Sequence, residues 1–454
     1  MVILFLFPFF FSIYYVLRKQ VDKAFLNVYL PCTFLVPYYY AFRLPHMPVL
    51  SVGTSALIPI GISLLLRPKM PWKFRRMDAL VVLFMVSFGL SEVLREASPK
   101  DGMLLWLGEF CEVFLAYVVG RQIIEPNLRL ATVKRIIFLF VIQTPFALYE
   151  FRFGQNVWLN MAHKVFQLSD VAWFVQLRGG TARIATAFGD TILAGMLFMV
   201  AMALNYYLVQ IYKLDKTRLG PKMNWLQKYR IPFFLLPIFL FMTNSRMPMA
   251  CGVMCYLFLQ IPRFRNIRTG AIVIVLTVSI GAGAVYAYFQ HYTSVSEDKA
   301  ADEAQTSAIY RKQLVEYYAP ILEEGGWLGW GTLSHPSVPG LSSIDNDYML
   351  VQLSQGKLGK YTFMLIALES VFTLAMFATK FRSRESQFLL FSLLGALIGI
   401  FVSLFTVYLG EQVLQVVFLL IGWSQSLQDT NVAVGARAVS SMPEPKFRFR
   451  RVIA

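Results

Sequence analysis

The stretch that decides the fold is ILAGMLFMVAMALNYYLVQIY, residues 192–212, which contains no charged side chain. The core of a bilayer is about 30 Å thick and needs a helix of roughly 20 apolar residues, so this segment is long enough to cross it. Twelve further apolar runs accompany it along the 454 residues. Hydrophobic residues make up 57% of the chain and charged residues only 15%. A soluble core cannot bury that much apolar surface, so we expect an all-α polytopic membrane protein with about 12–14 transmembrane helices.

The predicted spans, including that one, follow each other at short intervals. From the N-terminus they are Val2–Leu17, Ala24–Phe42, Val49–Leu66, Ala79–Leu94, Met103–Val119, Ile136–Leu148, Ile192–Tyr212, Ile231–Met242, Met247–Ile261, Ala271–Phe289, Tyr361–Thr379, Phe388–Leu409 and Val413–Leu427.

Basic residues gather in alternate gaps between these spans. If the N-terminus lies outside, thirteen crossings put 29 of the 42 lysines and arginines on the cytoplasmic side, where the positive-inside rule expects them. The net charge of +16 is spread over short loops that would face anionic lipid headgroups. It therefore indicates orientation in a lipid bilayer, with the C-terminus cytoplasmic, and we expect no binding to nucleic acid.

Two long segments lie on the outer side, where ordered loops usually carry function. The expected organisation is N-terminal transmembrane helices at 1–148, a first outer loop at 149–191, central transmembrane helices at 192–289, a large outer loop at 290–360, C-terminal transmembrane helices at 361–427 and a cytoplasmic basic tail at 428–454.

Four arginines stand out on the outer side, where basic residues are few: Arg178, Arg183, Arg246 and Arg311. A planar guanidinium fork suits a phosphate group, and these positions would let several forks reach one phosphate-bearing ligand. Arg246 ends a polar turn between two short apolar runs, so we expect it to point into a pocket. The alternative is that each arginine pairs with a nearby carboxylate such as Asp190, Glu150 or Glu316.

Two residues of the large outer loop are candidates for a general base. Asp345 precedes an apolar run, where it is either a base or the N-cap of the helix, and the two roles are compatible. His335 is the second candidate, because imidazole titrates near neutrality; the alternative is an exposed loop histidine.

Three carboxylates within predicted spans, Glu109, Glu112 and Glu369, favour a different class of protein. Ionisable residues at such depth usually face the interior of the bundle and mark a function or a buried pair. They support a proton-coupled transporter as the rival interpretation.

Four patches in a fixed order resemble the bacterial O-antigen ligase and Wzy-type polysaccharide polymerase superfamily. They are Arg183–Asp190 with the small residues that follow it, the turn Thr243–Arg246, the pair Tyr310-Arg311 with the later turn Leu328–Gly331, and Asp345–Tyr348 leading through Gly356 to Gly359.

The resemblance implies a helical fold of the GT-C type with two long periplasmic loops, in the bacterial inner membrane, and an active site that faces the periplasm. It implies metal-independent, inverting transfer of a glycan from an undecaprenyl-diphosphate-linked oligosaccharide to a hydroxyl of a lipid-linked acceptor, with no cofactor. Arg183, Arg246 and Arg311 would hold the diphosphate with help from Arg178. Asp345 or His335 would be catalytic, and the residues that shape the acceptor site would be Trp330, Asn346, Asp347 and Tyr348.

One departure from the family pattern bears on the reaction. Ligases of this superfamily usually carry histidine where this chain has Asp345, so the Asp-Asn form looks more like a polysaccharide polymerase. An O-antigen ligase that joins the glycan to lipid A-core is the alternative, and a flippase for lipid-linked oligosaccharide is a second one. The sequence leaves open whether a chain-length regulator binds.

Overall fold

The computed structural model describes residues 2–43, 46–96, 98–168, 173–214, 230–295, 303–341, 343–381 and 383–440. The end of the predicted basic tail, 441–454, lies outside these residues. Helices dominate the described part, and the extended elements are two hairpins of two-residue strands. The prediction of an all-α polytopic membrane protein is therefore confirmed.

The N-terminal half contains short, interrupted helices before its longer ones. In chain order the elements are η1 (Val2–Leu6), α1 (Phe7–Leu17), α2 (Val21–Ala24), η2 (Phe25–Tyr29), α3 (Leu30–Leu35), β1 (Ala41–Phe42), β2 (Leu50–Ser51), α4 (Val52–Leu66), α5 (Arg76–Arg95), α6 (Pro99–Glu109), η3 (Phe110–Phe114), α7 (Leu115–Ile123), α8 (Pro126–Ile142), α9 (Thr144–Phe153) and α10 (Val157–Lys164).

The C-terminal half holds the long helices and the second hairpin. Its elements are β3 (Leu177–Arg178), β4 (Thr181–Ala182), η4 (Thr186–Phe188), α11 (Thr191–Leu214), α13 (Ile231–Met242), α14 (Arg246–Phe258), η6 (Ile261–Arg263), α15 (Ile267–Tyr292), α16 (Glu303–Glu324), α17 (Asp347–Lys380), α18 (Arg384–Ser403) and α19 (Glu411–Ser440).

Every predicted span coincides with a helix or with consecutive helical segments, although some limits differ. Seven helical segments of the described chain are long and apolar enough to cross a membrane, and shorter apolar helices lie at Leu4–Leu17, Val52–Leu66 and Ile231–Met242. The predicted span Ala24–Phe42 is too long, because the helix ends at Leu35. Val36 precedes Pro37 and is extended, as steric contact with a proline ring requires.

The bundle is built around α11 and α18, which are buried along most of their length, whereas α15 is almost fully exposed. Helices α7 and α19 pack closely because each presents a glycine to the other. A Cβ at Gly120 would lie 2.1 Å from Leu419 O, and a Cβ at Gly422 would lie 2.1 Å from Tyr117 O. Small residues at such contacts are typical of packed helices in membranes.

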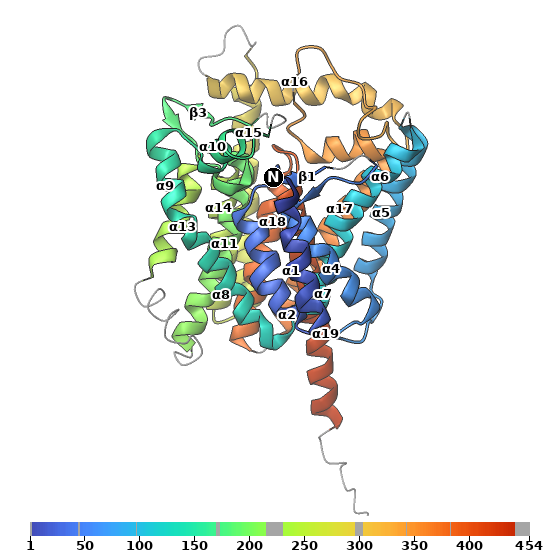
Figure 1. The fold of residues 1–454 in the computed structure, drawn as a ribbon. Coiled ribbons are helices and arrows are strands. Elements are labelled where there is room, and N and C mark those ends of the chain that lie inside the picture. The colour runs from blue at the N-terminus through green and yellow to red at the C-terminus, as the bar shows by residue number, and fades with distance from the viewer. Residues whose placement is uncertain are drawn as a thin grey trace, which may run out of the picture.

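The two long loops lie at the same end of the bundle (Figure 1). Helix α16 crosses that end, with α10 and β3 beside it, while α19 extends from the opposite end. The N-terminus is at the α16 end. The segments that carry the four arginines and Asp345 are thus brought to one end of the molecule.

Candidate functional site

Arg183 is buried and holds the turn between α13 and α14. Its Nε donates to Thr243 O at 3.1 Å and its terminal nitrogen to Ser245 Oγ at 2.7 Å. The other terminal nitrogen donates to Gln176 Oε1 at 2.5 Å. Thr243 and Ser245 are themselves buried, so this turn is recessed. Arg183 is therefore fixed by neutral oxygens and keeps its charge.

The other two arginines near this turn are placed differently. Arg178, on the β3 strand, donates to Asn244 O at 2.8 Å. Arg246 is exposed and is the first residue of α14. No side chain of the described residues pairs with Arg246. The turn Thr243–Arg246 thus accepts hydrogen bonds from Arg178 and Arg183, and its last residue is the exposed Arg246.

Arg311 lies on α16, the lid helix that crosses the end of the bundle where the two long loops lie (Figure 1). One terminal nitrogen donates to Ser307 O at 3.1 Å and to Ser307 Oγ at 2.8 Å. Its Nε is buried without a hydrogen-bond partner among the described residues. A buried donor without a partner is costly, so this guanidinium is a candidate for binding a ligand.

The four arginines lie close enough to influence each other's charge. The pKa of Arg183 is lowered to about 10, chiefly by burial and also by Arg178 and Arg311, while Asp190 acts in the opposite direction. Burial also lowers the pKa of Arg311, with Arg246 acting in the same direction and Asp345 against it. Arg178 and Arg311 therefore act on the charge of Arg183, and Arg246 acts on that of Arg311.

The carboxylates that were the alternative partners are arranged differently. Glu150 accepts hydrogen bonds from Asn156 Nδ2 at 2.9 Å and from Thr186 N at 2.8 Å. Glu316 lies 4.0 Å from Lys312 on the exposed face of α16. Burial raises the pKa of Asp190, whose Oδ1 accepts from the first amides of α11. None of the three forms an ion pair with Arg183 or Arg311 in the described part of the chain.

Glu150 and Asn156 also hold the backbone that follows Arg183. Thr186 has φ +50°, a left-handed conformation that is strained for a β-branched residue. Asn156 Nδ2 donates to Thr186 O at 2.9 Å while Glu150 accepts from Thr186 N. Hydrogen bonds to both the N–H and the carbonyl of Thr186 therefore hold the loop that carries Arg183.

The interpretation of Asp345 as an N-cap is wrong, because Asn346 takes that role. Asn346 has extended dihedrals, and its Oδ1 accepts from Met349 N at 3.2 Å. Asp345 is half-buried and accepts from Ser343 Oγ at 2.8 Å. Tyr310, next to Arg311, holds Ser343 by donating to its carbonyl at 2.6 Å. The Asp345 carboxylate is close enough to Arg311 to raise the pKa of that arginine.

Asp347 and Tyr348, two of the residues expected to shape the acceptor site, are buried. Asp347 accepts from Leu409 N at 2.8 Å, which ties the start of α17 to the loop before α19. Tyr348 donates to Phe401 O at 2.9 Å and packs on Phe405 with ring centroids 4.6 Å apart.

Trp330 belongs to a turn that inserts into a break in α17. Its indole donates to Ile321 O at 3.0 Å, and its amide donates to Leu353 O at 2.7 Å. The break is at Gly356, where φ is +68°. A Cβ at Gly356 would lie 2.4 Å from Gly329 N, so the two glycines allow the turn and the helix to touch through their backbones. Trp330 thus joins the lid to α17.

His335 lies in a segment whose contacts lead to α5. Just before it, Thr332 Oγ1 donates to Glu92 Oε1 at 2.6 Å and Ser334 Oγ donates to Glu96 Oε2 at 2.7 Å. His335 itself lies 3.4 Å from Pro336 O through its Nδ1. Among the described residues, Asp345 acts on the charge of Arg311, whereas the hydrogen-bond contact of His335 is with Pro336 O.

The carboxylates within spans have partners in the bundle. Glu112 accepts from Thr54 Oγ1 at 2.6 Å, and Glu369 lies 3.6 Å from Arg76. Glu109 also interacts within the described structure. Glu112 is therefore held inside the bundle, whereas the partner of Glu369 is an exposed arginine.

Sequence reasoning missed Gln176. Its Oε1 accepts from Arg183 and from Thr191 Oγ1 at 3.2 Å, and its Nε2 lies 3.5 Å from Asp190 Oδ2. A glutamine in a loop carries no pattern that distinguishes it, so no signal in the sequence marked this residue.

Fold and site together define a helical polytopic membrane protein with a cluster of arginines under a lid helix at one end. Residues 231–363 match the family described as O-antigen ligase. The match confirms the resemblance inferred from the sequence, and it includes Arg246, Arg311 and Asp345 but not Arg178 or Arg183. In general the family implies a glycosyltransferase- or ligase-type membrane enzyme that works on lipid-linked glycans. No curated protein matches the chain.

Proposed function

We propose that this protein is a polysaccharide polymerase of the bacterial inner membrane. It transfers a growing glycan from undecaprenyl diphosphate to a hydroxyl of a lipid-linked repeat unit on the periplasmic side. The observation that supports this most is the shared electrostatic neighbourhood of Arg178, Arg183, Arg246, Arg311 and Asp345, which come from the first outer loop, a broken span and the large outer loop.

Charge supports a diphosphate as the ligand. The arginines outnumber the two carboxylates that act on Arg183 and Arg311, which are Asp190 and Asp345. A diphosphate esterified at both ends carries two negative charges. Arg178 and Arg183 are anchored on backbone and side-chain oxygens, so they need little reorganisation when charge develops on the leaving group. Arg246 and Arg311 have donors left for the ligand.

Asp345 is the proposed base. Asp345 does not cap α17, so its carboxylate is available for another role. Its neighbour Arg311 would contact the diphosphate. An acceptor hydroxyl bound between Asp345 and the diphosphate would then face the anomeric carbon. The hydroxyl gives its proton to Asp345 as its oxygen forms the new glycosidic bond. The bond to the diphosphate breaks on the opposite face, which inverts the anomeric centre and leaves the electron pair on a phosphate oxygen held by the arginines.

The matched family favours a second candidate, an O-antigen ligase that joins the glycan to lipid A-core. The two reactions share the donor site and differ in the acceptor. In cells, loss of a polymerase leaves single repeats on the lipid carrier, whereas loss of a ligase leaves long polymer unattached.

The test is reconstitution of the purified protein with a lipid-linked repeat unit, scored for new glycosidic bonds. We expect polymer from the lipid-linked repeat alone. Product that forms only when lipid A-core is added would establish the ligase. Movement of the lipid-linked unit across the bilayer without a new bond would contradict both reactions and establish a flippase.

A further inference from the structure

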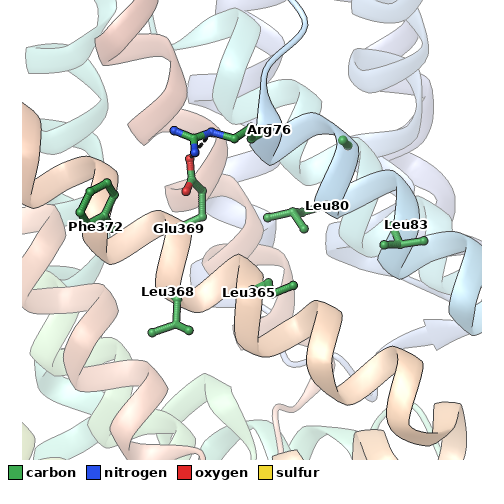
Figure 2. Close-up of a pocket in the computed structure, with 8 residues that line it drawn as sticks. Arg76, Leu80, Leu83, Leu365, Leu368, Glu369 and Phe372 are labelled. Atoms are coloured by element: carbon green, nitrogen blue, oxygen red, sulfur yellow. Dashed lines mark ion pairs between the residues drawn. The ribbon is translucent and has the colours of Figure 1, made fainter. Parts of the chain in front are cut away.

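A groove between α5 and α17 lies apart from the arginine cluster (Figure 2). It encloses about 580 Å³, within the range of about 300–1,000 Å³ that is typical of small-molecule sites. Most of its lining is apolar, and the side chains that form this part include Leu80, Leu83, Leu365, Leu368 and Phe372.

The apolar part of the groove faces outward from the bundle. Leu368 is 62% exposed and Phe372 is 56% exposed, and both α5 and α17 are long and apolar enough to span the membrane. In a bilayer the groove would therefore be filled by a hydrocarbon chain and not by water.

One ion pair interrupts this apolar surface, and Figure 2 shows its two side chains meeting across the groove. Arg76 Nε lies 3.6 Å from Glu369 Oε1, and the Arg76 side chain is 82% exposed. Thr373 Oγ1 donates to the same Glu369 oxygen at 3.2 Å. The terminal nitrogens of Arg76 and Glu369 Oε2 have no partner among the described residues. Charged groups on a lipid-facing surface are costly unless something satisfies them.

We propose that this groove binds a phospholipid with a zwitterionic headgroup that carries a primary ammonium, of the phosphoethanolamine type. The phosphate accepts from Arg76, the ammonium donates to Glu369, and one acyl chain lies along the leucines. Opposite charges side by side match such a headgroup, whereas an anionic headgroup would face repulsion from Glu369.

The place of Arg76 in the chain fits the depth of a headgroup. It ends the basic segment Arg67–Arg76 and begins α5, so Arg76 lies at the inner end of α5 in the orientation that the positive-inside rule predicts. Basic pockets between spanning helices on this side are common lipid sites. The proposal gives Glu369, a carboxylate that otherwise favoured a transporter, a role in lipid binding.

Native mass spectrometry of the full-length protein tests the proposal. The probes are phosphatidylethanolamine, its N-methyl and N,N-dimethyl forms, phosphatidylcholine and phosphatidylglycerol with identical chains. We expect about tenfold retention of the ethanolamine lipid over phosphatidylcholine, equivalent to ~1.4 kcal/mol. Most of the loss should come with the third methyl group, which removes the last N–H donor. This series uses the unmodified protein, so it does not depend on how any variant folds.

Variants then locate the site. Glu369→Gln should bring phosphatidylethanolamine and phosphatidylcholine close to equal retention. Leu368→Trp should reduce the retention of both lipids by filling the groove. The matched control is Leu276→Trp, at an exposed leucine of α15 away from the groove, which should change neither. Equal retention of all headgroups by the unmodified protein, a preference for phosphatidylglycerol, or an ethanolamine preference that survives Glu369→Gln would each overturn the proposal.

Discussion

Replacing Arg311 by alanine tests the diphosphate site most directly. Ser307 fixes only one terminal nitrogen of this arginine, and the buried Nε is without a partner in the described chain. The remaining donors are therefore already oriented when substrate binds. Removing one preorganised donor from a site of developing negative charge costs about 10²–10³-fold in kcat, or ~2.7–4 kcal/mol. The kcat of Arg311→Lys should lie between those of the wild type and Arg311→Ala, because lysine keeps the charge but lacks the planar fork.

The assay is the initial rate of glycosidic bond formation by purified protein in proteoliposomes, with thermal unfolding as the measure of folding. Lys312→Ala is the matched control, because Lys312 is the next residue of α16 and its only described ion pair is a 4.0 Å exposed contact with Glu316. Exposed pairs contribute at most about 1 kcal/mol to stability, and we expect a rate within about twofold of wild type. Equal rates for Arg311→Ala and wild type, or equal losses in both variants, would refute the role of Arg311.

Further expectations concern the base, the broken helix and the ligand. Asn346→Ala should cost about 1 kcal/mol of stability through the lost cap, while Asp345→Asn should keep the unfolding temperature and lower turnover; an unchanged rate would remove Asp345 as the base. Gly356→Ala should destabilise by at least about 1–2 kcal/mol, because φ is +68° and a Cβ would lie 2.4 Å from Gly329 N; an unchanged unfolding temperature would contradict that contact. Inorganic pyrophosphate at about ten times its Kd should stabilise the wild type by ~1.4 kcal/mol; Arg246→Ala should weaken this shift, and a shift of the same size would remove Arg246 from the site.

The helical architecture was predictable because a bilayer leaves few choices. Backbone polar groups in lipid must be satisfied within the segment, so a long apolar run can only be helical. The run at 192–212 accordingly lies within α11, Thr191–Leu214. Prediction was poorer where a helix ends inside an apolar run. Val36–Phe42 is as apolar as the helix before it, and only Pro37 shows that the chain leaves the helix there.

The charged residues of the candidate site could be predicted from the sequence, whereas the residues that hold them in place could not. Arg246 and Arg311 stood out because basic residues are rare on the outer side. Asp345 and Asn346 could not be ranked as caps from sequence, because both side chains cap helices equally well and the backbone dihedrals decide. Gln176 carried no signal, since its importance comes from three contacts that form only after the loops fold.

The way Arg183 is anchored fits the proposed binding of a diphosphate. A guanidinium held by a carboxylate is already neutralised, whereas Arg183 is held by Thr243 O, Ser245 Oγ and Gln176 Oε1. Neutral oxygens fix the geometry and leave the charge in place. Burial makes that charge costly and, together with Arg178 and Arg311, lowers the pKa of Arg183 to about 10 although Asp190 acts in the opposite direction. A dianionic ligand would reduce this cost, so the proximity of Arg178 and Arg311 to the buried Arg183 favours the binding of a diphosphate.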